Sequence, residues 1–210
     1  MSAAAEQTLD TLIAAAEAGR DAPYVSGRQF VLWGALVALA LSAQAGLEAW
    51  RPPGVGAWAI GVWASMGLVG GGLSAVLGAA AARKPGANTM LNRIGRAVWI
   101  SAGLGIGGFA VGVIGYNAVQ DAPTLALYDL ILPTAFVFYA GAYGVSAQFT
   151  PAAWPRLGAL ACGLSAIAGF SLIGSAWLYP VAALAMIPVA ILPGLWLMAR
   201  EPKASAPDHG

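Results

Sequence analysis

The sequence predicts an all-α fold, a polytopic integral membrane bundle of six transmembrane helices with both termini in the cytoplasm (N-in/C-in). Apolar residues make up 59% of the 210 residues and charged residues only 9%, whereas a soluble domain has about 25% charged residues. The apolar residues form six runs that each reach the ~20 residues needed to cross a bilayer. The runs form one domain over 29–199 and cover residues 29–50, 55–82, 94–118, 124–147, 156–175 and 178–199.

The cationic residues predict the orientation of this bundle. Nine of the ten lie in the N-terminal segment, the second loop, the fourth loop and the C-terminal tail, and only Arg51 lies in an odd-numbered loop. Basic segments remain in the cytoplasm because Lys and Arg resist translocation. Eight Arg against two Lys, with abundant Ala and Gly, point to a bacterial source. We therefore expect a multi-pass protein of the bacterial cytoplasmic (inner) membrane.

Residues 1–28 are expected to form a short cytosolic amphipathic helix followed by a linker. Leu9, Leu12 and Ile13 recur with helical spacing and form one apolar stripe, while the other face is acidic. A helix that binds anionic lipid would carry Lys and Arg on its polar face. The stripe is therefore expected to pack under the bundle or to dock a partner protein, unless the segment is disordered.

Turn signals separate the spans in order. Pro52-Pro53-Gly54 ends the first span, and Arg83-Lys84-Pro85-Gly86 ends the long second one. The loop that follows is polar and basic up to Arg96. Three prolines, at 180, 188 and 193, make the sixth helix prone to kinks because proline lacks a backbone N–H. Residues 200–210 are polar and predict a disordered cytosolic tail.

Tryptophan positions are typical of the aromatic belts at the two membrane interfaces. Four tryptophans lie near the predicted cytoplasmic ends of spans, and three lie near the opposite ends. The first group is Trp33, Trp99, Trp154 and Trp196, and the second is Trp50, Trp58 and Trp177.

Two ridges of small residues run along the second and third spans. Small residues let helix backbones approach closely in lipid, where no hydrophobic drive brings helices together. The ridges indicate that the two helices pack against each other or against neighbours in the core. They also fit a homodimer seam or a sliding surface. The residues are Ala64, Gly67, Gly71, Ser74 and Gly78 in the second span, and Ser101, Gly105, Gly108, Gly112 and Gly115 in the third.

Polar residues gather near the non-cytoplasmic ends of three spans. Their depth favours either an interfacial hydrogen-bond cluster or a binding vestibule in which Glu48 and Asp129 titrate. Asp129 is expected to face the bundle, water or Arg51. The candidate vestibule residues are Gln44, Glu48, Arg51, Asn117, Gln120, Tyr128 and Asp129. Tyr139 and Tyr143, one helical turn apart, either line a ligand cavity or fill the core.

Missing residue types narrow the function. The only histidine, His209, lies in the tail, so histidine-bound haem and metal centres are not expected. G-x-G-x-x-G at residues 103–108 lies inside a span and lacks the strand that a dinucleotide site needs. The spans contain no lysine, the chain has no G-x-S-x-G motif, and the net charge is +1. We expect no metal, no cofactor and no nucleic-acid partner.

The sequence therefore predicts a non-catalytic multi-pass membrane protein that acts as a partner-binding, sensory or complex-stabilising module. Its expected partners are membrane lipid, a cytosolic or membrane protein and, as a homo-oligomer, further copies of itself. The alternative is a small-solute or ion transporter or channel with a polar vestibule on the non-cytoplasmic side. The single Cys162 lies inside a span and is expected to be a core thiol.

Overall fold

The computed structural model describes residues 7–8, 27–84, 87–120 and 126–201, and every long element in them is helical. Most of the predicted N-terminal helix, with Leu9, Leu12 and Ile13, lies outside the described residues, as does the tail from residue 202. The labelled helices are α2 (Gly27–Trp50), α3 (Val55–Ala82), α4 (Met90–Ala118), α5 (Ala126–Asp129), α6 (Ile131–Ser146), α7 (Trp154–Ser171), α8 (Leu178–Met186), the π-helix η1 (Ile187–Ile191) and α9 (Leu192–Ala199).

Five helical segments are long and apolar enough to cross a membrane, so the chain is a multi-pass membrane protein. They are α2, α3, α4, the α5–α6 unit and the α8–α9 unit. α7 stands apart from these five through its composition: its 18 residues span roughly 27 Å of helix, but Pro155 and Arg156 in its first turn lower its mean hydropathy. Five of the six predicted spans are therefore supported by length and composition.

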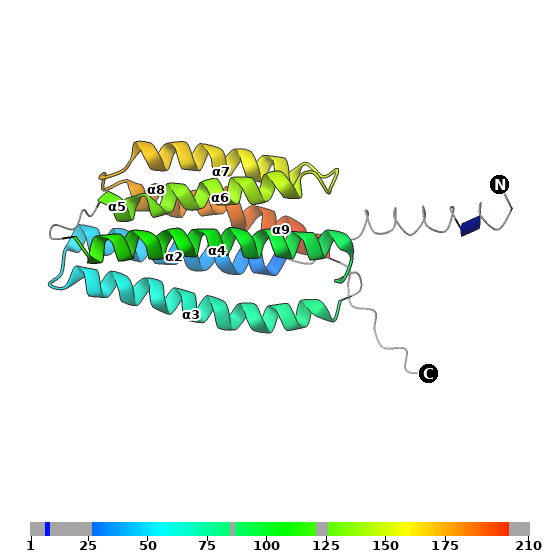
Figure 1. The fold of residues 1–210 in the computed structure, drawn as a ribbon, viewed down its shortest axis with the longest axis horizontal. Coiled ribbons are helices and arrows are strands. Elements are labelled where there is room, and N and C mark those ends of the chain that lie inside the picture. The colour runs from blue at the N-terminus through cyan, green and yellow to red at the C-terminus, as the bar shows by residue number, and fades with distance from the viewer. Residues whose placement is uncertain (1–6, 9–26, 85–86, 121–125, 202–210) are drawn as a thin grey trace.

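The helices form one elongated bundle in which they run along a common direction (Figure 1). α2 packs against α3 on one side and against α8, η1 and α9 on another. α6 packs along α7 and also against α4. α3 and α4 follow each other in the chain but do not form a packed pair, because each lies against a different helix.

The helix boundaries largely follow the apolar runs, with one clear extension. α3 covers the predicted residues 55–82, and its start follows Gly54, whose φ of 73° lies in the left-handed region that glycine adopts without strain. α4 begins at Met90 instead of 94, so Arg93 lies on the helix instead of in a loop. A helix continues into the polar interface because it satisfies its own backbone groups there, while long basic side chains reach water.

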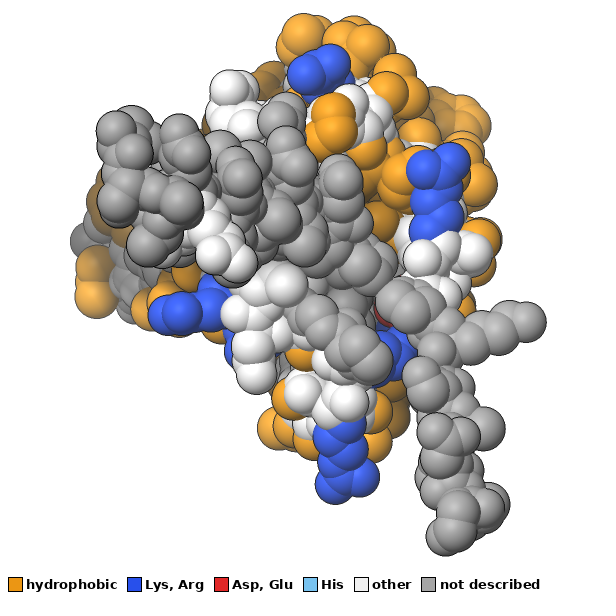
Figure 2. All heavy atoms as spheres, turned by 90° about the vertical axis from the view of Figure 1, so that its right-hand side faces the viewer, with side chains coloured by type: hydrophobic (Ala, Val, Ile, Leu, Met, Phe, Trp, Pro, Cys, Tyr) orange, Lys and Arg blue, Asp and Glu red, His pale blue; other side chains and the backbone are white. Residues whose placement is uncertain are grey.

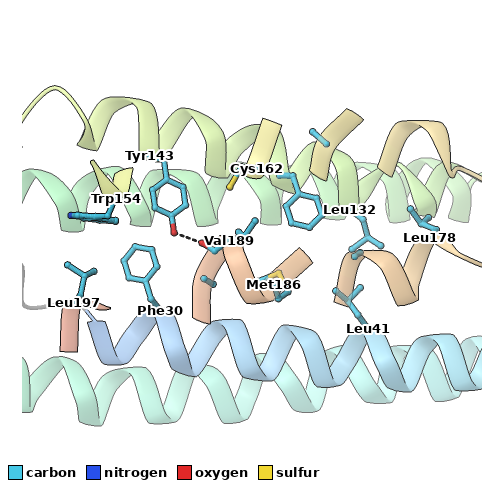
Figure 3. Packing of buried hydrophobic residues seen from close by; sticks show 14 residues of the cluster. Phe30, Leu41, Leu132, Tyr143, Trp154, Cys162, Leu178, Met186, Val189 and Leu197 are labelled. Carbon is cyan, nitrogen blue, oxygen red and sulfur yellow. Dashed lines mark hydrogen bonds between the residues drawn. The ribbon is translucent and has the colours of Figure 1, made fainter. Parts of the chain in front are cut away.

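The last span contains the expected departure from α-helical geometry. The backbone N–H of Leu192 bonds to the carbonyl of Ile187, five residues earlier, which is the π-helical pattern. Pro193 has no N–H for the carbonyl of Val189, four residues before it. The hydroxyl of Tyr143 donates a hydrogen bond to that carbonyl instead (Figure 3). Tyr143 is fully buried, so it fills the core and does not line an open ligand cavity.

One end of the core is aromatic. The ring of Phe30 lies 4.7 Å from that of Trp99, centroid to centroid, and Trp99 lies 4.9 Å from Tyr143; both pairs are edge-to-face. Trp154 is 7% exposed and joins the same group. These tryptophans face the bundle interior, so at this end they do not form the lipid-facing belt that their sequence positions predict. Gly158 on α7 leaves room for the Tyr143 ring of this group, because an added Cβ there would lie 2.6 Å from that ring.

The tryptophans at the opposite end do face outward. Trp50, Trp58 and Trp177 are 76%, 60% and 68% exposed. Exposed indole rings at the ends of apolar helices are typical of a membrane interface. At this end the predicted belt residues are exposed, whereas at the basic end Trp154 is buried and Trp33, Trp99 and Trp196 are partly buried.

Candidate functional site

The inner face of α3 is defined by two small residues that contact α2. A Cβ added at Gly70 would lie 2.7 Å from the Trp33 ring, so the ring occupies the space that a side chain would need. Trp33 Nε1 donates to Ser74 Oγ at 2.9 Å. Ser74 Oγ in turn donates to Gln29 Oε1 at 2.9 Å, and Gln29 Nε2 donates to the Ser74 carbonyl at 3.0 Å. Ser74 therefore packs α3 against α2, as a ridge residue is expected to do.

Only one glycine of the predicted α4 ridge contacts a neighbouring helix of the bundle. Gly105 lies under the ring of Phe138 on α6, where an added Cβ would come within 2.6 Å of the ring. Ala102 and Asn117 are buried on the same side of the helix. Ser101, the first residue of the ridge, is exposed. α4 is therefore held by α6 through a line of residues that only partly coincides with the predicted one.

The remaining glycines of both ridges face away from the bundle. Nothing lies within 4 Å of the position where each of their Cβ atoms would stand. The expected packing of the second span against the third is not formed within the chain, because α3 and α4 each turn a different side toward their neighbours. We call these residues the outward glycine surface; they are Gly67, Gly71 and Gly78 of α3 and Gly108, Gly112 and Gly115 of α4.

α3 and α4 are also the least covered spans. Only 6% of the most apolar window of each is buried, against 28–39% in the other three spans. Large apolar side chains are exposed alongside the glycines, among them Leu68 at 79%, Leu104 at 72% and Val111 at 70%. In a bilayer such faces meet either lipid or another helix. The glycines favour contact with another helix over contact with lipid, because the absence of side chains permits close approach of the two backbones.

The predicted vestibule residues gather only in part. Gln44 is 6% exposed, and its Nε2 donates to Glu48 Oε1 at 2.9 Å. The other amide atom, Gln44 Oε1, is buried and has no hydrogen-bond partner among the described residues. An unsatisfied buried acceptor costs about 1–3 kcal/mol. Asn117 is buried, Gln120 is exposed, and Tyr128 is partly buried.

Asp129 is held by the turn after α7 and by the first turn of α8, and not by Arg51. Its Oδ1 accepts a hydrogen bond from the Tyr179 hydroxyl at 2.9 Å, and its Oδ2 accepts one from the backbone N–H of Gly174 at 3.0 Å. Arg51 Nε instead donates to the backbone carbonyl of Glu48 at 3.3 Å. Asp129 thus faces the bundle, as one of the expected alternatives states.

Tyr179 and Gly174 belong to this cluster but were missed by the sequence reasoning. Their positions in the predicted spans could have indicated this contact. Tyr179 is the second residue of the sixth predicted span, and Asp129 lies near the start of the fourth. Both therefore lie close to the same membrane surface. We call Gln44, Glu48, Asp129 and Tyr179 the polar cluster.

The opposite end of the bundle carries a second charged group. Glu201, with a side chain only 7% exposed, pairs with Lys84 and lies 3.9 Å from Arg28 Nε. These ion pairs join the start of α2, the end of α3 and the end of α9. The Arg200 guanidinium lies 3.9 Å above the Trp196 ring. Figure 2 faces this basic end and shows Lys and Arg side chains spaced around it.

Two small cavities of the described region lie away from the polar cluster. One, of about 210 Å³, lies between α7 and α8 and is lined mostly by apolar residues such as Leu164 and Val181. The other, of about 10 Å³, lies between α4, α6 and the start of α7. Within the described ranges no group of three or more His, Cys, Asp or Glu side chains could hold a metal ion.

Comparison of the chain with family models, with curated proteins and with solved structures found no match.

Proposed function

We propose that this chain is a non-catalytic membrane module that assembles with other membrane helices and stabilises the resulting complex. The observation that carries the proposal is the outward glycine surface. α3 and α4 are the least covered of the five spans, and the six glycines of this surface have nothing within 4 Å of their Cβ positions. Neither of the two cavities described above includes the polar cluster, which favours assembly over a solute pathway.

The occupant we propose is a second copy of the chain. Most homo-oligomers have two-fold symmetry, in which the same patch serves both subunits. Gly108, Gly112 and Gly115 follow one another at spacings of four and three, so they lie on one side of α4 and permit a self-complementary crossing. Lipid tails alone do not require glycine on a helix face, because large apolar side chains are equally well solvated by them.

The basic end supports a membrane orientation. Arg28, Lys84, Arg93 and Arg156 all belong to helix ends or connections on that side, whereas Arg51 lies at the other. We propose that the basic end faces the cytoplasm, with α7 as a sixth, shorter span in a bacterial inner membrane. This arrangement follows the tendency of basic segments to remain untranslocated.

The assembly proposal is tested by enlarging the outward glycines. In Gly71→Leu and Gly112→Leu variants, the mass of the particles in lipid nanodiscs is expected to fall from that of an oligomer to that of one chain. Gly163→Leu on α7 is the matched control, because Gly163 also has nothing within 4 Å but lies outside α3 and α4. A wild-type particle that holds a single chain, or an equal loss of mass in all three variants, contradicts the proposal.

A further inference from the structure

The polar cluster contains an acceptor that the protein itself does not satisfy. Gln44 is more than nine-tenths buried, and its Oε1 has no partner among the described residues. Its Nε2 is fixed on Glu48 at 2.9 Å, which places the free oxygen of the same amide beside the cluster. Lipid offers no donors at this depth, so the missing donor or cation must come from the aqueous side.

Negative charge surrounds this acceptor. α2, which carries Gln44 and Glu48, packs against α8, which carries Tyr179, and the Tyr179 hydroxyl donates to the Asp129 carboxylate. Both ion pairs of the described region lie at the basic end of the bundle, so neither carboxylate is paired with a cationic side chain. Arg51, the one cationic residue among the described residues on this side, donates to a backbone carbonyl.

The neighbouring groups are all oxygen ligands. The amide oxygen of Gln44, the carboxylates of Glu48 and Asp129 and the hydroxyl of Tyr179 form a set that suits hard cations or ammonium groups. Among the described residues, the carboxylates of Glu48 and Asp129 and the guanidinium of Arg51 give a formal balance of −1 at this end, which suits a monovalent cation. Glu48 is exposed, so it connects the buried amide with the aqueous surface.

We propose that the polar cluster binds a small monovalent cation from the side of the membrane opposite the basic end. Gln44 Oε1 is the inner ligand and Glu48 the entry ligand. Asp129, oriented by Tyr179 and Gly174, supplies the second charge. The proposal stands on different residues from the assembly surface of α3 and α4, and either proposal can fail without the other.

The test measures thermal unfolding of the full-length chain in detergent, followed by tryptophan fluorescence. Chloride salts of Na⁺, K⁺ and methylammonium are each titrated against N-methyl-D-glucamine, a bulky cation, at constant ionic strength. A ligand that binds only the folded state raises the unfolding temperature in a saturable manner. At least one small cation is expected to do so, with an apparent affinity at least tenfold weaker in Glu48→Gln and Asp129→Asn.

Gln44→Leu provides the sharpest comparison. This variant removes the unsatisfied oxygen, so it is expected to lose the cation response while unfolding in N-methyl-D-glucamine at a temperature no lower than that of the wild type. Gln148→Leu, at an exposed position outside the cluster, is expected to keep the full response. Three results overturn the proposal: no response of the wild type to any small cation, an equal response in every variant, or a change in Gln44→Leu that is the same in all salts. The last result would indicate that an ordered water molecule, and not a cation, satisfies Gln44 Oε1.

Discussion

The hydroxyl of Tyr143 on α6 donates a hydrogen bond to the carbonyl of Val189 in the π-helical segment of the last span. Val189 is the residue whose helical donor Pro193 removes, because proline has no backbone N–H. An unsatisfied carbonyl is costly in a bilayer, where water is absent. The tyrosine therefore compensates for the proline and links α6 to the centre of the last span.

Tyr143→Phe is expected to lower the free energy of unfolding by about 1 kcal/mol, because the carbonyl of Val189 loses the hydrogen bond that the tyrosine hydroxyl donates. Thermal unfolding in detergent measures the effect, and Tyr116→Phe, at a residue that is 57% exposed, serves as the control. In a Pro193→Ala background the backbone N–H returns, so the effect of Tyr143→Phe is expected to shrink. Equal effects in both backgrounds would show that the hydroxyl does not compensate for Pro193.

Gly70 and Gly71 are neighbours in sequence but are expected to respond oppositely to alanine. An added Cβ at Gly70 would lie 2.7 Å from the Trp33 ring, which Ser74 holds by a hydrogen bond, so Gly70→Ala is expected to cost about 1–3 kcal/mol. Gly71 has nothing within 4 Å inside the single chain, so Gly71→Ala is expected to leave the stability of the detergent-solubilised monomer unchanged or raise it by about 0.5–1 kcal/mol.

The reactivity of the buried Cys162 measures how Gly70→Ala and Gly71→Ala affect the opening of the bundle. It is fully buried in the core, so a thiol reagent reaches it only when the bundle opens. Modification is expected to be faster in Gly70→Ala than in the wild type and no faster in Gly71→Ala. Similar rates in both variants would mean that α3 does not pack on α2 through Gly70.

Glu201 is expected to stabilise the end of α3 through its ion pair with Lys84. Glu201→Gln removes the charge from a side chain that is 7% exposed, leaves Lys84 and Arg28 without their partner, and is expected to cost about 2 kcal/mol. Arg28→Gln removes an exposed partner and is expected to cost less than about 1 kcal/mol. Hydrogen exchange at residues 78–84 is expected to rise only in Glu201→Gln, and equal exchange in the two variants would contradict the difference.

The orientation of the bundle is testable with single cysteines in a Cys162→Ser background. Asn88 lies at the basic end and Gln120 at the opposite end, and both are exposed. A membrane-impermeant maleimide added to intact cells is expected to label Gln120→Cys and to spare Asn88→Cys until the membrane is opened. The reverse labelling pattern would invert the proposed topology.

The apolar runs were sufficient to predict the helices because a bilayer-spanning segment has few alternatives to an α-helix. α3 covers the residues that its run predicts, and Gly54 precedes it as a turn residue. The apolar run of α7 was weaker evidence for a membrane span, because Pro155 and Arg156 shorten its apolar stretch. Nor could the apolar pattern show that α4 continues to Met90, because polar residues at an interface are compatible with both helix and loop.

The sequence was less informative about which side of each helix faces inward. Small residues at helical spacing mark a face that can approach a neighbour, but the pattern is the same for a neighbour within the chain and for one in another chain. Ser74 and Gly105 turned out to contact α2 and α6, while Gly112 faces outward. Glu201 was assigned to the tail because its two cationic partners lie far away in the sequence.

The most direct test of assembly through the outward glycine surface is disulfide cross-linking in native membranes. Each variant carries one new cysteine in a Cys162→Ser background, at Gly112 on the surface or at Gly163 on α7, and both positions have nothing within 4 Å. Mild oxidation is expected to produce a covalent dimer of Gly112→Cys and none of Gly163→Cys. Failure of Gly112→Cys to form a dimer, or equal dimer formation at the two positions, would contradict assembly through this surface.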